Sequence, residues 1–267
     1  MTFLDTITAI DIPDFAESGE LPLGSFTWMH GNKAGKTPGA FYGKAIEFSG
    51  APSAPWVADN ERFDNENGYS APTLKIAVIG YRSQWYTGGE VKGERKMWLP
   101  NYVEGIGAKK QVELIVFAEG LGDEPMIVTL PKVSKAKPME QIIKVYRNGL
   151  LTQATRLAKR ALPLWSFWLP IHGATKAGKA VYEEFSGKDG KASYVTTPVL
   201  DLPADALDTL FVGAEMIRKG AEVANQYAHW VNERRIPPQI SEGVVESEHR
   251  NVLQLVGEGE TGGGEDL

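Results

Sequence analysis

The sequence predicts a mainly β fold, a β-barrel with helices, followed by a C-terminal helical region and a disordered acidic tail. Segments rich in β-branched and aromatic residues alternate with Gly, Pro, Asn and Asp clusters over the first half of the chain. A helical period replaces this pattern near residue 138, and the last 27 residues are acidic and glycine-rich. With 267 residues, 42% of them hydrophobic, the chain is long enough to bury a substantial core.

Six strands are expected in the first half of the chain. Their predicted ranges are 24–30, 40–49, 73–86, 95–103, 111–119 and 125–131. Residues 51–72 carry Pro, Asn and Gly without periodicity and predict a long loop. Glycines within residues 87–90 and 120–123 predict hairpin connections.

The second half of the chain begins with a predicted amphipathic helix over residues 138–160. Its polar face carries Lys144, Arg147, Arg156, Lys159 and Arg160. Further strands are expected at 164–172, 180–185 and 192–199, and a last helical block at 204–235. The predicted organisation is an acidic arm (1–23), one domain (24–240) and the acidic tail (241–267). Two of the aromatics Trp165, Phe167 and Trp168 are expected in the core, and Trp230 is expected to pack its helix.

Charge is distributed unevenly along the chain. Residues 71–160 contain fifteen basic and eight acidic side chains, whereas residues 241–267 contain seven acidic side chains and one basic. The overall net charge of −6 hides this separation. A basic middle segment favours an anionic partner.

The sequence lacks the residues or motifs that several classes of function require. The chain has no cysteine, and its four histidines are scattered. Residues 173–180 have the spacing of a phosphate loop, but Ala180 stands where Ser or Thr would reach Mg²⁺. A hydrolase built from dispersed carboxylates stays open, yet we expect a binding protein without cofactor or metal. No leader or membrane span is recognised, so a cytoplasmic protein is expected.

Residues 81–102 interleave aromatic and basic side chains. Rings stack on nucleobases and cations neutralise phosphates, so this segment predicts a nucleic-acid site. Trp85 should share a strand face with Tyr81, and Tyr86 with Arg82. The alternative is that one row of rings packs in the core. The predicted stacking residues are Trp85, Tyr86, Trp98 and Tyr102, and the predicted phosphate contacts are Arg82, Lys92, Arg95, Lys96, Lys109 and Lys110.

The acidic tail completes a familiar arrangement. With its terminal acids Glu258, Glu260, Glu265 and Asp266, behind a strand-rich core, the chain resembles bacterial and phage single-stranded DNA-binding proteins. The resemblance implies an elaborated OB-fold and a tail that recruits replication and repair proteins and competes with DNA for the basic groove. This tail ends in Leu267 rather than in the family's aromatic residue.

The resemblance implies single-stranded DNA as the partner, in replication, recombination or repair. The same side chains would also bind RNA, and a homo-oligomer is compatible with the sequence. The alternative is a carbohydrate-binding or phage structural module that uses the same aromatics. No membrane partner is expected.

Removal of residues 241–267 tests whether the tail competes with DNA. The deletion should tighten binding of a poly-dT oligomer at low salt, because a tethered anion no longer occupies the basic segment. Affinity measured by fluorescence titration at low and high salt checks this, and an unchanged affinity at low salt excludes tail competition.

Overall fold

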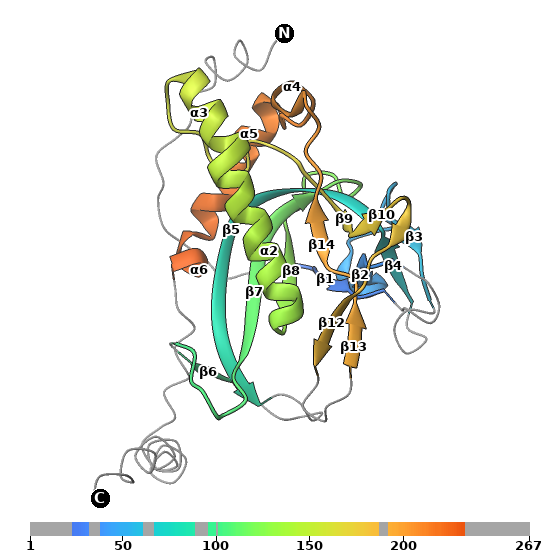
Figure 1. Ribbon diagram of the computed structural model, residues 1–267. Coiled ribbons are helices and arrows are strands. Elements are labelled where there is room, and N and C mark those ends of the chain that lie inside the picture. The colour runs from blue at the N-terminus through green and yellow to red at the C-terminus, as the bar shows by residue number, and fades with distance from the viewer. Residues whose placement is uncertain are drawn as a thin grey trace, which may run out of the picture. The chain divides into compact units, whose positions relative to one another are not determined.

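The computed structural model describes residues 23–31, 38–60, 67–88, 96–99, 101–186 and 192–232 (Figure 1). All of them fall within the first of two structural units, Met1–Arg234. The predicted N-terminal arm, apart from Leu23, and the predicted acidic tail lie outside the described residues.

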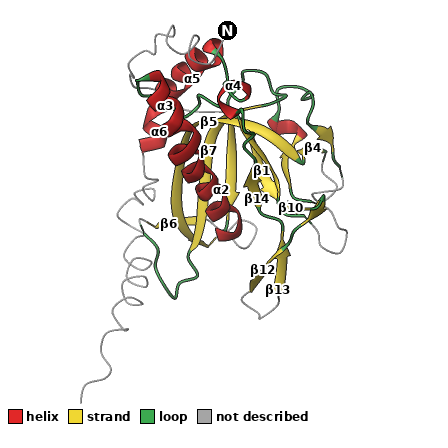
Figure 2. Ribbon diagram, turned by 45° about the horizontal axis from the view of Figure 1, so that its top comes forward, coloured by secondary structure: helices red, strands yellow, loops and turns green. Residues whose placement is uncertain are grey.

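The described residues contain a ten-stranded mixed sheet that curls into a half-barrel (Figures 1 and 2). Its order is β14-β9-β5-β7-β8-β1-β2-β4-β3, and β6 pairs with β5. The pairing of β1 with β8 is parallel, whereas β1 pairs antiparallel with β2. The prediction of a mainly β fold is confirmed, and the curled sheet is compatible with an OB-like fold. The strands are β1 (Ser25–Met29), β2 (Ala40–Lys44), β3 (Val57–Ala58), β4 (Gly68–Ala71), β5 (Thr73–Gly88), β6 (Lys96–Leu99), β7 (Lys109–Ala118), β8 (Met126–Pro131), β9 (Leu169–Gly173) and β14 (Pro198–Leu200).

The longest strand, β5, connects most of the sheet. It pairs with β7 from Ile76 to Tyr86, and β9 and β6 pair with its two ends. The register shifts between Val78 and Gly80, which is a bulge. A bulge changes which side chains point to each face of the sheet. The alternation of faces after residue 80 therefore does not continue in phase from the start of β5.

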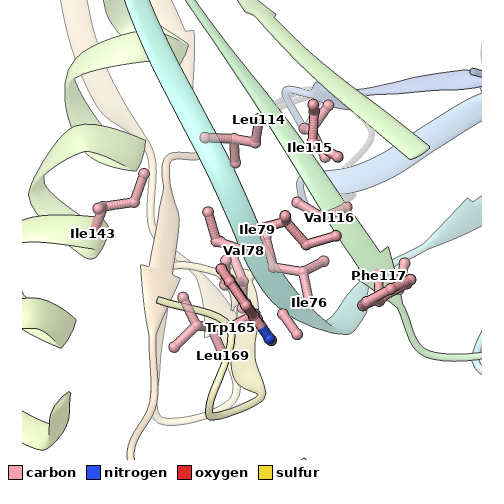
Figure 3. Close-up of a cluster of buried hydrophobic side chains, with 14 of the residues drawn as sticks. Ile76, Val78, Ile79, Leu114, Ile115, Val116, Phe117, Ile143, Trp165 and Leu169 are labelled. Atoms are coloured by element: carbon pink, nitrogen blue, oxygen red, sulfur yellow. The ribbon is translucent and has the colours of Figure 1, made fainter. Parts of the chain in front are cut away.

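The core is centred on β5 and β7 (Figure 3). All residues of β7 from Gln111 to Ala118 are buried, which is the pattern of a strand covered on both faces. Ile143 of the long helix packs into the same cluster as Ile76 and Val116. Branched aliphatic residues suit this position because they pack well against a pleated surface.

A long helical segment lies across the curled sheet (Figure 2). It consists of α2 (Val133–Tyr146), a π-helical turn η2 (Arg147–Leu151) and α3 (Thr152–Ala158). The helix predicted over 138–160 is confirmed, but it starts at Val133, and Pro138 lies inside its early turns. Because the sheet curls, α2 contacts β7, β8 and the edge strand β14 together.

The predicted block over 204–235 is divided into three helices. These are α4 (Ala206–Thr209), α5 (Ala214–Gln226) and α6 (Ala228–Asn232), of which α5 and α6 contact β5. Gly213 has a φ of 87°, which interrupts the helical path before α5. Trp165, Phe167 and Trp230 are buried, as predicted. Within the described part of the chain, no helix is long and apolar enough to cross a membrane.

Several predicted boundaries were wrong. The predicted loop 51–72 contains β3 and β4, which are too short to show alternation in the sequence. The predicted strand 164–172 begins only at Leu169. Residues 173–180 include the hairpin of β10 (Thr175–Lys176) and β11 (Lys179–Ala180), which no helix follows directly, so they are not a phosphate loop. The strands β12 (Glu183–Ser186) and β13 (Ala192–Val195) form a second small hairpin.

The contact between α5 and Trp165 gives a stability test. A Cβ atom at Gly220 would lie 2.3 Å from the Trp165 ring, so Gly220→Ala should lower the free energy of unfolding by about 1–3 kcal/mol. Gly149→Ala is the matched control, because its Cβ would meet no atom within 4 Å. That control should raise stability by up to about 1 kcal/mol. Urea unfolding of both variants checks the packing, and equal stabilities would contradict it.

Candidate nucleic-acid interface

The aromatic residues of the β5–β6 hairpin are divided between two faces of the sheet. Tyr86 is paired with Trp98 on β6 and with Lys109 on β7. Trp85 is paired with Leu99 on β6 and with Lys110 on β7. Successive residues of a strand point to opposite faces, and directly paired residues share one. We call these the Tyr86 face and the Trp85 face.

On the Tyr86 face, the Tyr86 ring is buried, whereas Trp98 is half-buried and Lys96 is exposed. Tyr86 is only 3% exposed, and its ring centre lies 5.6 Å from that of Trp98. The ammonium groups of Lys96 and Lys109 lie 4.7 and 5.9 Å from the Tyr86 ring centre. Because its ring is already covered by protein groups, Tyr86 has no free surface for a stacked base.

Arg82 lies on the same face and is also buried. Its Nε donates to Glu113 Oε2 at 2.7 Å, and its guanidinium carbon lies 3.9 Å from the Trp230 ring centre. Its Nη1 donates to the Trp230 carbonyl at 3.2 Å. Glu113 accepts a further bond from Gln111, which accepts one from Lys96. This network favours a structural role for Arg82 over the phosphate contact expected from the sequence.

The Trp85 face is open. Tyr102 is 56% exposed, and its ring centre lies 4.8 Å from that of Trp85, with the ring planes tilted by 55°. Met97, which faces the same way, is also largely exposed. The ammonium of Lys110 lies 5.5 Å from the Trp85 ring centre. This face therefore combines a half-buried tryptophan and an exposed tyrosine with an adjacent cation.

Helix α2 borders the Trp85 face. Lys110 Nζ donates to Glu140 Oε2 at 2.6 Å, and Arg147 Nη1 lies 3.4 Å from the Tyr81 hydroxyl. These two contacts tie the middle of α2 and the start of η2 to β7 and β5. Basic side chains of α2 are thus continuous with the Trp85 face.

A surface groove runs beside α2. Its walls include the cations Lys137 and Lys144 and the acids Glu140 and Glu183. Lys137 and Lys144 are exposed, and they lie seven residues apart, which is two turns on one side of the helix. Since Glu140 also holds Lys110, the groove and the Trp85 face meet at this ion pair.

A second group of cations lies at the start of α2. His30 contacts the Thr196 carbonyl and the Ser134 hydroxyl, each at 3.2 Å. Burial lowers the pKa of His30, and the nearby charges of Lys135 and Lys132 lower it further. Burial lowers the pKa of Lys135 to about 8, with Lys132 adding to the effect. Among the described residues, no group of three His, Asp or Glu side chains is placed to hold a metal ion.

The structure thus places the predicted residues in three settings. Trp85, Tyr102 and Lys110 come together on the Trp85 face, whereas Arg82, Tyr86, Lys96, Trp98 and Lys109 belong to the Tyr86 face. Lys92, Arg95 and the tail acids Glu258, Glu260, Glu265 and Asp266 lie outside the described residues. The predicted set lacked Lys137, Lys144 and Glu140. The excess of basic residues over 132–160, eight against one acid, was the available indication.

No protein-family model matches the chain, and no curated protein and no solved structure is significantly similar to it.

Lys135 gives a pH-dependent stability test. Its pKa is lower in the folded protein than in the unfolded chain, so the protonated side chain opposes folding below about pH 8, and this cost disappears as the pH rises toward 10.5. Lys135→Met should raise the free energy of unfolding by about 1–2 kcal/mol at pH 7 and by much less near pH 10. Denaturant unfolding at both pH values checks this. The exposed Lys137→Met is the control, and an equal gain in both variants contradicts the assignment.

Proposed function

We propose that this protein binds single-stranded DNA with little sequence preference and acts in DNA replication, recombination or repair. Bases would stack on Trp85 and Tyr102, and Lys110 with the cations of α2 would neutralise the phosphates. Binding requires no chemistry, so the proposal is a binding protein rather than an enzyme.

The contact between the half-buried Trp85 and the exposed Tyr102 is the observation that carries this proposal. The two ring centres are 4.8 Å apart, and Tyr102 is more than half exposed. An aromatic surface stacks with any base because every base has a π face. Lys110, close to the Trp85 ring, supplies the charge that a neighbouring phosphate needs.

The charge of α2 supports a polyanionic partner. Lys137, Lys144 and Arg147 are exposed on this helix, and they continue the Trp85 face beyond Lys110. Four such contacts to a single strand predict a slope of log affinity against log salt of about −3. A strand that follows this path would contact rings at one end and cations along the rest.

The proposal extends to partners. Acidic residues at the end of the chain, including Glu265 and Asp266, would recruit replication or repair proteins, as the resemblance implies. RNA would satisfy the same rings and cations, so competition between dT and rU oligomers decides between the two. A carbohydrate-binding module would use the same rings to bind glycans without salt dependence. A phage structural module would use them as a subunit interface and would form a large oligomer, which light scattering detects.

Trp85→Ala tests which face binds. Stacking contributes about 1–3 kcal/mol per base, so the substitution should weaken binding of a dT oligomer roughly 5- to 150-fold. Fluorescence anisotropy with a labelled oligomer, recorded from low to high salt, measures both the affinity and the salt slope.

Trp98→Ala is the matched control, because Trp98 is on the same hairpin but on the Tyr86 face. It should change the affinity little, and thermal melting confirms that both variants are folded. If Trp98→Ala loses more affinity than Trp85→Ala, the other face binds. Wild-type protein that binds glycans, or that shows no salt-dependent binding of dT, excludes the proposed function.

A further inference from the structure

Glu140 is the only acid in a long basic stretch of the sequence. Residues 132–160 contain eight basic side chains and this one carboxylate. An isolated acid in such a stretch either faces solvent or forms an ion pair with a particular cation. The structure decides between these two roles.

Glu140 holds the cation beside the aromatic pair. Its Oε2 lies 2.6 Å from Lys110 Nζ, and that ammonium lies 5.5 Å from the Trp85 ring centre. Both side chains are mostly covered, with 27% of Glu140 and 16% of Lys110 exposed. The carboxylate therefore occupies the place where an incoming phosphate would meet Lys110.

We propose that Glu140 is a built-in competitor for phosphate at Lys110. This inference rests on the proposed function of the Trp85 face. A carboxylate oxygen and a phosphate oxygen accept the same charge-assisted hydrogen bond from an ammonium group. A bound strand must displace Glu140 from Lys110 and then lie beside an unpaired negative charge.

The cost of this displacement is small enough to allow binding. In a largely covered ion pair, the cost of desolvation offsets much of the Coulomb attraction, so we expect a net contribution of about 1 kcal/mol, which corresponds to about a fivefold change in affinity. Glu140 thus lowers affinity without preventing binding. The effect of such a competitor is faster release of the strand, because affinity differences within one interface lie mostly in the dissociation rate.

A second acid in the same groove separates competition from general repulsion. Glu183 also lines the groove, but it accepts a hydrogen bond from Thr197 rather than pairing with Lys110. Glu140→Gln and Glu183→Gln remove the same charge from the same groove and keep the shape of the side chain. Only Glu140→Gln removes the negative charge that is paired with Lys110.

The experiment measures affinity and dissociation rate of a dT oligomer for the full chain at low salt. Glu140→Gln should tighten binding about fivefold and slow dissociation, whereas Glu183→Gln should change both less. In a Lys110→Met background, Glu140→Gln should increase the affinity much less. Thermal melting verifies that each variant is folded.

Four results overturn the inference. Equal gains from Glu140→Gln and Glu183→Gln indicate general repulsion, and weaker binding of Glu140→Gln indicates that the carboxylate positions Lys110 for binding. Unchanged affinity of Glu140→Gln, with Trp85→Ala still weakening binding, removes the inference but leaves the proposed function intact. Failure of the wild-type protein to bind dT removes both.

Discussion

Strand β5 pairs with other strands at both edges and contacts helices on both faces. These contacts determine which of its side chains are buried and which reach the surface. β7 and β9 pair with its edges, α2 lies on the Trp85 side, and α5 and α6 contact it from elsewhere in the fold. From Gly80 onward, Arg82 and Tyr86 are buried on one face, whereas Ser83 and Trp85 on the other face are exposed and half-buried. The bulge before Gly80 fixes this assignment, because a shift of one residue would exchange the two faces.

The Arg82–Glu113 pair shows how a charged residue is accommodated on a buried face of β5. Their side chains are only 8% and 7% exposed, so both charges are largely removed from water. Such a pair contributes little net stability, yet loss of one partner leaves an uncompensated buried charge. The bonds of Arg82 to the ring and carbonyl of Trp230 also attach α6 to β5. We infer that the pair sets the position of α6 rather than the overall stability of the fold.

These contacts explain which features of the fold local sequence patterns could predict and which they could not. The strand pattern and the helical period predicted the curled sheet and the α2–α3 segment, because both depend on local periodicity. Alternation correctly separated Trp85 from Tyr86, but it could not say which of the two faces solvent. That choice depends on Glu113 and Trp230, which approach Arg82 from positions 31 and 148 residues away. Short strands such as β4 were missed because four residues carry too little pattern.

The environment of each charged side chain distinguishes those that stabilise the fold from those available for binding. Where burial is deep, as at Arg82, the cation is paired with an acid. Lys137 and Lys144 instead stand exposed along a groove, and Lys135 keeps a largely buried ammonium whose pKa is lowered. Cations held at a cost to stability are uncommon unless they serve binding or catalysis. Glu140 is the one carboxylate in the basic stretch 132–160, and it is paired with Lys110. Its position between Lys110 and the groove makes sense if the surface must release its ligand as readily as it binds it.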